Sequence, residues 1–287
     1  MYKYKILEAN KDFIFREQSV SNTKGSRDKR IIIDKKNGET GFFKYEKYDC
    51  SEACSEKLSY EIAKKLDKPA AKIEFAKDEK GTLGIISYLF IKNNITHTDA
   101  KDFFNANEFD RKKFCTINAI KSFLDKYDQK QFEHFLGIMV FDALIGETDR
   151  HEENWGLIKE NNSYRLSPIY DSGCNLLREL KNKENARKIY EGIINFDNYI
   201  LKSKTCIYKE NLKTRYKHFE LIEELYNKYP NVIKKEIKNL KKLSDKDIEK
   251  IVDKLPENII EEQHKEFIKK YLIKRKDILL KIIEKGE

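Results

Sequence analysis

Short apolar runs separated by turn residues dominate the first ninety positions, a pattern that predicts strands around one helix. The β-branched run 30–34 is followed by Asn37-Gly38, two residues that tolerate the positive φ of a tight hairpin turn. We expect residues 41–45 to return as the second strand. Side chains alternate along a strand, so Phe42 and Lys44 should share one face.

One helix interrupts these predicted strands. Ser51 is a suitable N-cap, because its hydroxyl can accept from the first free backbone N–H groups. Leu58, Ile62 and Leu66 then recur at helical spacing as the main apolar stripe, and Pro69 marks the end of the helix. Another buried strand is predicted at 84–90.

From about Asp99 the pattern changes to one that is mainly helical. Apolar residues at three-and-four spacing predict a central, buried helix over 131–145. Two short strands are expected at 155–158 and 164–166, and helices return from Phe219 to the end. The sequence therefore predicts an α+β fold, with a strand-rich first part and a helical second part.

The loop after the buried helix carries the most informative chemistry. Asp149 and Asn154 are spaced as Asp-x4-Asn, and Asp171 follows after the predicted hairpin. Phosphoryl transfer needs a carboxylate at the attacking hydroxyl, and an amide oxygen and a second carboxylate to hold Mg²⁺. Asp and Asn are also ordinary turn residues, so Asp-x4-Asn alone is weak evidence. Asp171 and the buried helix favour a phosphotransferase.

The first half of the chain supplies what an ATP site also requires. Lys44 lies in the middle of a predicted strand, where a kinase-type site needs a lysine for the phosphates. A lysine on a solvated strand edge is the simpler interpretation of the same position. Glu56 or Glu61 on the following helix could orient Lys44, and periodicity does not decide between them. The polar loop 22–29 could surround phosphate oxygens with backbone amides.

Composition narrows the class of protein. The 287 residues are 39% hydrophobic and 37% charged, which is typical of a soluble globular chain and not of a disordered one. The net charge of +9 is spread along the chain without a dense basic run, so we do not expect nucleic acid as a partner. The five cysteines form no CxxC pair and are interpreted as reduced thiols of a cytoplasmic protein. No stretch approaches the ~20 apolar residues of a membrane span, although export without such a signal stays open.

Several segments together resemble the HipA-like family of bacterial serine/threonine kinases. Residues 148–154 resemble that family's catalytic loop, 166–171 its metal-binding segment and 25–29 its phosphate loop. The helix around Glu56 resembles the corresponding family helix, which favours Glu56 over Glu61 as the partner of the strand lysine. The likeness is strongest to a compact, cell-translocating member of the family.

The resemblance implies a two-lobed, protein-kinase-like fold. A strand-rich ATP lobe would comprise residues 1–91 and a helical lobe residues 92–287. It also implies that Asp149 is the catalytic base or hydroxyl-orienting group, and that Asn154 and Asp171 bind Mg²⁺. The implied ATP contacts are Gly25, Ser26 and Lys29 at the phosphates, Lys44 with its partner Glu56, His151 near the phosphates, and backbone groups of Ser87 and Leu89 at the adenine.

The expected reaction is transfer of the ATP γ-phosphoryl group to Ser or Thr of a protein, including the chain itself. Acceptors beside the phosphate loop are Ser21, Thr23 and Ser26. Longer HipA-like proteins act with a DNA-binding antitoxin, so an antitoxin or inhibitor is a second expected class of partner. Two alternatives stay open: a phosphoinositide-type lipid kinase, whose loop also resembles Asp-Arg-His-x-x-Asn, and a non-catalytic pseudokinase or binding protein.

Overall fold

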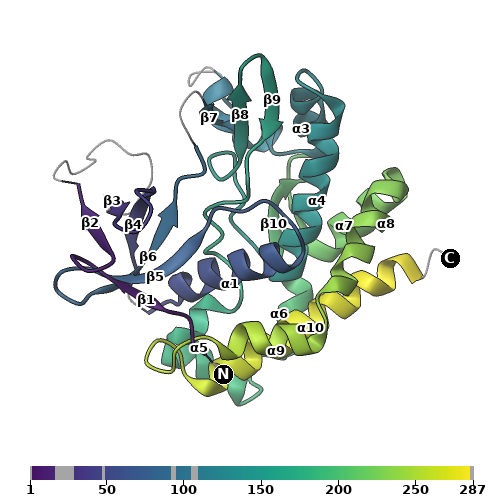
Figure 1. Cartoon of the computed structure of the whole chain (residues 1–287). Helices are drawn as coiled ribbons and strands as arrows, with labels where there is room; N and C mark the ends of the chain where they lie inside the picture. The colour runs from purple at the N-terminus through teal and green to yellow at the C-terminus, as the bar shows by residue number, and fades with distance from the viewer. Residues whose placement is uncertain (1, 17–28, 47–48, 92–94, 105–108, 285–287) are drawn as a thin grey trace.

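The computed structural model describes residues 2–16, 29–46, 49–91, 95–104 and 109–284. A six-stranded sheet lies at one end of the molecule, and helices form most of the other end (Figure 1). In spatial order the sheet contains β1 (Ile6–Glu8), β5 (Ile73–Lys77), β6 (Leu83–Tyr88), β4 (Thr40–Tyr45), β3 (Lys29–Asp34) and β2 (Phe13–Phe15). β1 pairs with β5 in parallel, and the other neighbours are antiparallel.

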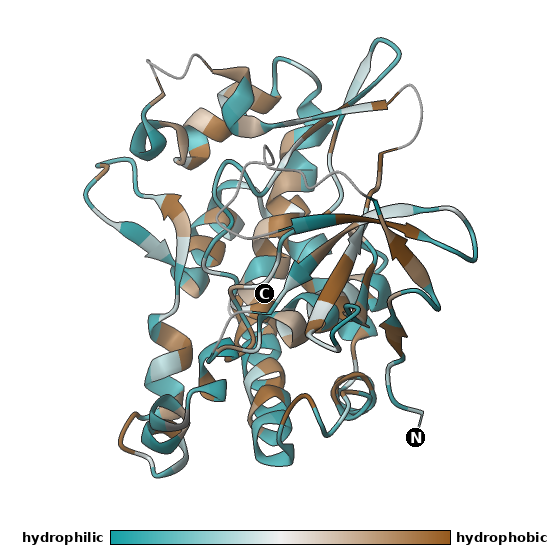
Figure 2. Cartoon of the chain, turned by 90° about the vertical axis from the view of Figure 1, so that its left-hand side faces the viewer, coloured by the Kyte–Doolittle hydropathy of each residue, from teal (hydrophilic) through white to brown (hydrophobic). Residues whose placement is uncertain are grey.

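Strand alternation divides the residues of β4 between the two faces of the sheet, as the sequence predicts. Phe43 is fully buried in a small core with Phe13 and Ile32 on one face. Phe42 and Lys44 lie on the opposite face and line a cleft. Coloured by hydropathy, the strands of this sheet carry continuous hydrophobic segments, whereas the helices alternate along their length (Figure 2).

Helix α1 (Glu52–Lys65) lies between the sheet and the C-terminal helices (Figure 1). Its predicted stripe of Leu58, Ile62 and Leu66 is buried. Ser51 occupies the N-cap position, but its hydroxyl makes no cap hydrogen bond and donates to the Arg178 carbonyl at 3.2 Å. The predicted helix start is therefore confirmed, but the predicted use of the serine hydroxyl is wrong.

The second part of the chain also contains strands. β7 (Ile95–Asp99), β8 (Gly156–Glu160) and β9 (Ser163–Leu166) form an antiparallel sheet, and β10 (Lys204–Tyr208) pairs with β11 (Arg215–Lys217). The β8–β9 hairpin agrees with the predicted pair of short strands. β7, β10 and β11 were not predicted. β7 and β10 contain β-branched residues, but the runs are short and the sequence does not show which segment each would pair with.

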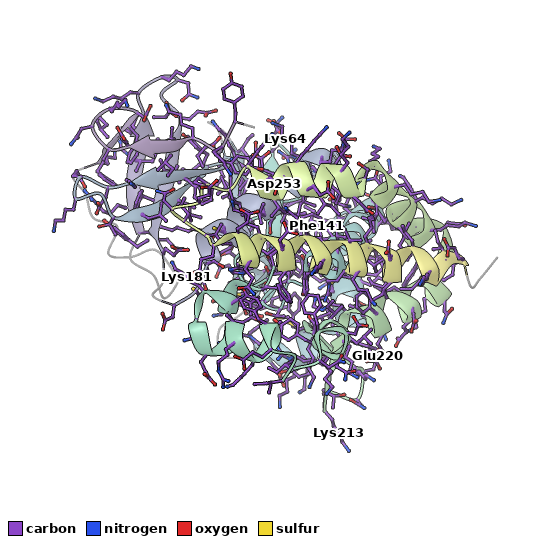
Figure 3. All side chains as sticks on the ribbon, turned by 90° about the horizontal axis from the view of Figure 1, so that it is seen from below. Lys64, Phe141, Lys181, Lys213, Glu220 and Asp253 are labelled. Atoms are coloured by element: carbon purple, nitrogen blue, oxygen red, sulfur yellow. The ribbon has the colours of Figure 1, made fainter. Side chains whose placement is uncertain are left out.

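The helices pack around α4 (Gln129–Ile145), which the sequence predicts as the central helix. The others are α2 (Arg111–Phe114), α3 (Ile117–Leu124), α5 (Lys183–Tyr190), α6 (Phe196–Lys202), α7 (His218–Lys228), α8 (Pro230–Asn239), α9 (Asp245–Asp253) and α10 (Glu262–Glu284), with short 3₁₀ turns η1 (Ala100–Phe103), η2 (Arg178–Lys181) and η3 (Leu240–Lys242). Phe141 of α4 has no exposed surface and lies near the centre of the molecule, whereas Lys213 projects from its margin (Figure 3). Among the described residues, no helix is both long and apolar enough for a bilayer.

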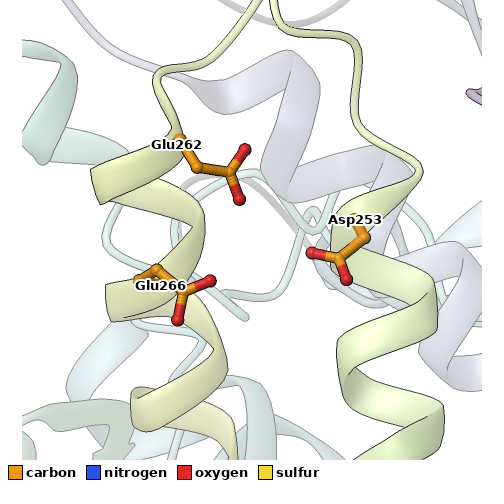
Figure 4. Close-up of side chains that lie close together, drawn as sticks. All are labelled: Asp253, Glu262 and Glu266. Carbon is orange, nitrogen blue, oxygen red and sulfur yellow. The ribbon is translucent and has the colours of Figure 1, made fainter.

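Three carboxylates gather where α9 meets α10, namely Asp253, Glu262 and Glu266 (Figure 4). Lys269 Nζ lies 2.5 Å from Asp253 Oδ1 and 2.6 Å from Glu266 Oε1, and Lys265 Nζ lies 3.0 Å from Glu262 Oε2. The lysines offset the negative charge, so we assign this cluster to the packing of α9 against α10.

Gly146 ends α4 in a conformation that only glycine adopts readily. Its φ is 73°, in the left-handed region, and a Cβ at this position would overlap the Tyr271 hydroxyl of α10. The close approach of α10 and the turn into the following loop therefore both require glycine.

We expect Gly146→Ala to lower the free energy of unfolding by about 2–4 kcal/mol, from the left-handed φ and from the forced displacement of Tyr271. Gly192 is a matched control, since it has the same φ of 73° but open space at its Cβ. Gly192→Ala should lower the free energy of unfolding by only about 1–2 kcal/mol, as measured by urea denaturation. Equal losses for the two variants would contradict the packing argument, and Tyr271→Phe should partly rescue Gly146→Ala.

Candidate active site

A cleft of about 530 Å³ collects residues from distant parts of the sequence. Eight of the predicted site residues line it: Lys29, Lys44, Ser87, Leu89, Asp149, His151, Asn154 and Asp171. Glu56 lies behind Lys44, in contact with its ammonium group. Gly25 and Ser26, and the predicted acceptors Ser21 and Thr23, lie outside the described residues.

Lys44 is the buried cation of the cleft. Its Nζ lies 2.9 Å from Glu56 Oε2 and 2.8 Å from Asp171 Oδ1, and only 5% of the residue is exposed. Burial by itself lowers the pKa of Lys44, but the two carboxylates outweigh burial and raise it to about 12. Glu61 instead pairs with Lys57 at 2.8 Å. Of the two helix carboxylates that periodicity left open, Glu56 is therefore the partner of Lys44.

A line of serines attaches α1 to the segment that contains Asp171. The hydroxyls of Ser51, Ser55 and Ser59 donate to the carbonyls of Arg178, Asn175 and Ser172 at 3.2, 2.9 and 3.4 Å. Spacing of four places these serines on one face of the helix. Glu56 lies on the same helix, so the contacts set the position of the Glu56 carboxylate relative to Asp171.

The predicted catalytic loop is held mainly through its backbone. The Asp149 N–H donates to Glu147 Oε1 at 2.8 Å, and Asn154 Nδ2 donates to the Asp149 carbonyl at 2.7 Å. The Asp149 side chain stays 48% exposed, with Oδ2 3.8 Å from His151 Nε2 and 3.6 Å from the Cys174 thiol. The loop is therefore rigid in its backbone while its carboxylate faces the cleft.

Arg150 connects this loop to its surroundings. The side chain is buried, and its guanidinium donates to both carboxylate oxygens of Asp142 in α4, at 3.0 and 3.2 Å. It also donates to the Asn154 carbonyl at 3.1 Å, the Tyr170 carbonyl at 2.7 Å and Ser172 Oγ at 2.7 Å. Burial lowers the pKa of Arg150, but Asp142 outweighs burial and raises it above its ordinary value. One charged group thus positions α4, the loop and the segment around Asp171.

Asn154 and Asp171 fit a hard divalent cation by the chemistry of their donors. The amide nitrogen of Asn154 donates within the loop, so its oxygen is the group that the side chain can offer. Asp171 has a φ of 54°, a strained backbone for a non-glycine residue, and its carboxylate is 37% exposed. An amide oxygen and a carboxylate are ligands that Mg²⁺ accepts.

The strand that leads into the second part of the chain lines the other end of the cleft. Ser87 lies inside the sheet, paired with Phe42 and Ile73, and the Leu89 N–H donates to the Thr40 carbonyl at 2.9 Å. An adenine contact by Leu89 would therefore have to use its carbonyl, because its N–H already donates within the sheet.

Sequence reasoning missed several residues of the cleft. Phe90, His97 and Tyr170 form an aromatic cluster on its wall, with ring centroids 5.2–5.7 Å apart. Arg178 also lines the cleft and pairs with Glu52. Tyr170 lies within the segment 166–171, but no pattern in the sequence predicts that its ring joins Phe90 and His97. Arg150 was visible within Asp-Arg-His, but its five acceptors come from three separate segments.

His218 supports the loop from behind. Its Nε2 lies 2.7 Å from the Glu147 carbonyl, and its Nδ1 lies 3.0 Å from Ser203 Oγ and 3.1 Å from the Ser203 carbonyl. A neutral ring protonated at Nε2 donates to Glu147 and accepts from the Ser203 hydroxyl. Burial, together with the positive charge of Arg275, lowers the pKa of His218 from 6.5 to about 3. Burial raises the pKa of Glu147 to about 7.

Comparisons with known proteins agree with this geometry. The sequence profile of the HipA-like C-terminal domain matches residues 21–261. The serine/threonine-protein kinase CtkA of Helicobacter pylori strain J99 is 25% identical over 215 residues, which are 69% of this chain and 58% of that protein. The match therefore spans less than two thirds of that relative.

Solved structures extend the likeness over most of the fold. The crystal structure of the H. pylori proinflammatory kinase CtkA matches with a TM-score of 0.78 and 19% identity, covering 94% of this chain and 96% of that one. A chain of the Shewanella oneidensis MR-1 toxin–antitoxin complex of HipA, HipB and operator DNA matches with a TM-score of 0.55 and 14% identity, covering 94% and 67%. The predicted α+β, kinase-like fold is confirmed.

We expect Arg150→Met to lower the free energy of unfolding by about 3–5 kcal/mol, because the Asp142 carboxylate would stay buried without its partner. The control is Arg165→Met, which removes an arginine that is 48% exposed and 4.0 Å from Glu160. Arg165→Met should lower the free energy of unfolding by at most about 1 kcal/mol. Adding Asp142→Asn to Arg150→Met should restore part of the lost free energy of unfolding, as measured by chemical denaturation. A double variant no more stable than Arg150→Met would contradict the charge argument.

His218 makes stability depend on pH. Folded His218 stays neutral while the unfolded histidine takes up a proton below pH 6.5, so acid favours unfolding and the stabilisation is lost from pH 6.5 toward 3. Wild type should therefore lose up to about 1.4 kcal/mol more per pH unit than His218→Gln as the pH falls from 6.5 to 5. The control is His134→Gln, at an exposed position on α4. Its stability, followed by melting curves, should change with pH as that of the wild type does. The same acid slope in His218→Gln and wild type would be inconsistent with a buried neutral ring.

Proposed function

The chain belongs to the HipA-like C-terminal domain family, and from this premise we propose that it is an ATP- and Mg²⁺-dependent serine/threonine protein kinase. The observation that supports this most directly is the position of Lys44, in contact with both Glu56 and Asp171 in a cleft that Asp149 and Asn154 also line. The name of the curated relative CtkA, a serine/threonine-protein kinase, agrees with the proposal.

Each residue has a defined part in the proposed reaction. The acceptor hydroxyl oxygen forms a bond to the γ-phosphorus, the bond from that phosphorus to the bridging oxygen breaks, and ADP leaves. The Asp149 carboxylate orients the hydroxyl and receives its proton. Asn154 and Asp171 would hold Mg²⁺, which offsets phosphate charge when it is bound. These roles need no rearrangement of the loop backbone, since its hydrogen bonds already hold it.

Lys44 would contact the phosphates, with Glu56 as its orienting partner. The ammonium group is a permanent cation at neutral pH, because its pKa lies near 12. Lys29, the last residue of the predicted phosphate loop, begins β3 and lines the same cleft. We therefore also propose self-phosphorylation at Ser21, Thr23 or Ser26, where a phosphate adds about 1.5–2 negative charges and should weaken ATP binding.

The test is transfer of label from γ-labelled ATP with Mg²⁺, to the chain itself and to protein and phosphoinositide acceptors assayed in parallel. We expect transfer to protein, and we expect Asp149→Ala to reduce it by at least about 100-fold, since the variant loses proton transfer and hydroxyl orientation. Asp277→Ala, at an exposed site on α10, should retain the wild-type rate.

Full activity of Asp149→Ala would refute the assigned mechanism. Label that enters only the lipid would instead identify a lipid kinase. Mass spectrometry of the labelled chain then tests the three proposed self-acceptors directly, and label confined to other residues would exclude them.

A further inference from the structure

A second hollow, of about 540 Å³, borders the catalytic loop. Thr148 lines this hollow, and the next residue, Asp149, lines the nucleotide cleft. The remaining walls come from the loop between α5 and α6 and from α6 itself. The two sites therefore meet at adjacent residues of one loop, whose Cα atoms are separated by about 3.8 Å.

The wall of the hollow presents aliphatic side chains to solvent. Ile193 is 61% exposed and Ile194 is 37% exposed, and both line the hollow. Nearly all other aliphatic side chains of comparable size in the described ranges are buried or half-buried. Adjacent exposed isoleucines beside a reaction centre are typical of a surface that another molecule covers.

The wall is held in place before anything binds. The Ile194 N–H donates to the Lys188 carbonyl at 2.8 Å, and Asn195 Oδ1 caps α6 by accepting from the Asn198 N–H at 2.9 Å. On the opposite side, Thr148 Oγ1 donates to the Cys174 carbonyl at 3.0 Å. A surface fixed by such contacts loses little conformational freedom when it binds a partner.

We propose that this hollow receives the acceptor segment of the protein substrate, with an aliphatic side chain near the acceptor Ser or Thr packed on Ile193 and Ile194. The inference rests on the proposed kinase function. The acceptor hydroxyl has to reach Asp149, and in this proposal the polypeptide on one side of it passes Thr148 into the hollow. An extended chain advances about 3.3 Å per residue, which brings residues close to the acceptor over the hollow.

Charge adds a second element of selectivity. Lys202 lines the hollow and is exposed, and the chain as a whole carries a net charge of +9. A lysine or arginine at the docked position of the substrate would meet this positive charge and would also leave the isoleucines uncovered. The site therefore favours aliphatic residues and disfavours basic ones at that position.

The experiment uses the full chain, MgATP and peptide libraries with a central Ser or Thr, in which each flanking position is varied in turn. At one flanking position, wild type should label peptides with Ile, Leu or Val about tenfold faster than those with Lys or Arg, at peptide concentrations below KM. The double variant Ile193→Ser/Ile194→Ser should lose this preference and raise the peptide KM about tenfold, with the KM for MgATP unchanged.

Leu201→Ser is the matched control, because Leu201 is an aliphatic residue of α6 that is 45% exposed and lies outside the residues lining the hollow. It should keep both the preference and the peptide KM. Melting temperature and MgATP turnover of each variant check that it is folded.

Four results would overturn the inference. They are no aliphatic preference in wild type, the same preference in the double variant, no labelled peptide despite turnover of MgATP, and a dimer of the chain that dissociates in the double variant. The last result would show that a second copy covers the isoleucines. Absence of any MgATP turnover in wild type would instead remove the proposed kinase function, and the docking inference with it.

Discussion

The arrangement of the candidate site depends on one buried ion pair, between Arg150 of the loop and Asp142 of α4. Burying a guanidinium away from water is costly unless oxygen acceptors surround it. Here the five hydrogen bonds of Arg150 go to α4, the loop and the residues on either side of Asp171. Planar, bidentate geometry makes the pair directional, so it sets orientation as well as distance. The central helix thereby becomes the frame from which Asp149 and Asp171 are positioned.

Helix α1 provides the second constraint. Its line of serine hydroxyls contacts carbonyls of residues 172–178, and the same helix carries Glu56, which contacts Lys44 of the sheet. Each of these hydrogen bonds contributes only about 0.5–1.5 kcal/mol to the free energy of unfolding. Their main effect is to hold α1 in one position relative to residues 172–178. The Lys44 charge is balanced from both sides, by Glu56 of the helix and by Asp171. The sheet, helix α1 and the segment that contains Asp171 therefore meet at the ammonium group of Lys44.

The two surfaces next to the proposed catalytic loop differ in the chemistry that they present. The cleft around Lys44, which we propose binds the nucleotide, gathers carboxylates, an amide and a lysine, which suit phosphates and a divalent cation. The second hollow presents Ile193 and Ile194, which suit an aliphatic side chain. Because Thr148 and Asp149 separate these surfaces, a kinase of this design would recognise its nucleotide and its acceptor through independent sets of contacts. Substitutions in the hollow should then alter substrate choice without altering ATP binding.

Local sequence determined the elements whose stability is local. The hairpin with Phe42 and Lys44 on one face, the buried helix before Gly146, and the Asp149, Asn154 and Asp171 set all follow from periodicity, turn residues and spacing. Periodicity left Glu56 and Glu61 open and the family resemblance favoured Glu56, whereas the contact of Lys44 with Glu56, and of Glu61 with Lys57, was decided by packing. Tertiary structure also decided the partners of Arg150 and the pairing of β7 with β8, because the pattern within a segment does not show which distant segment it will bind.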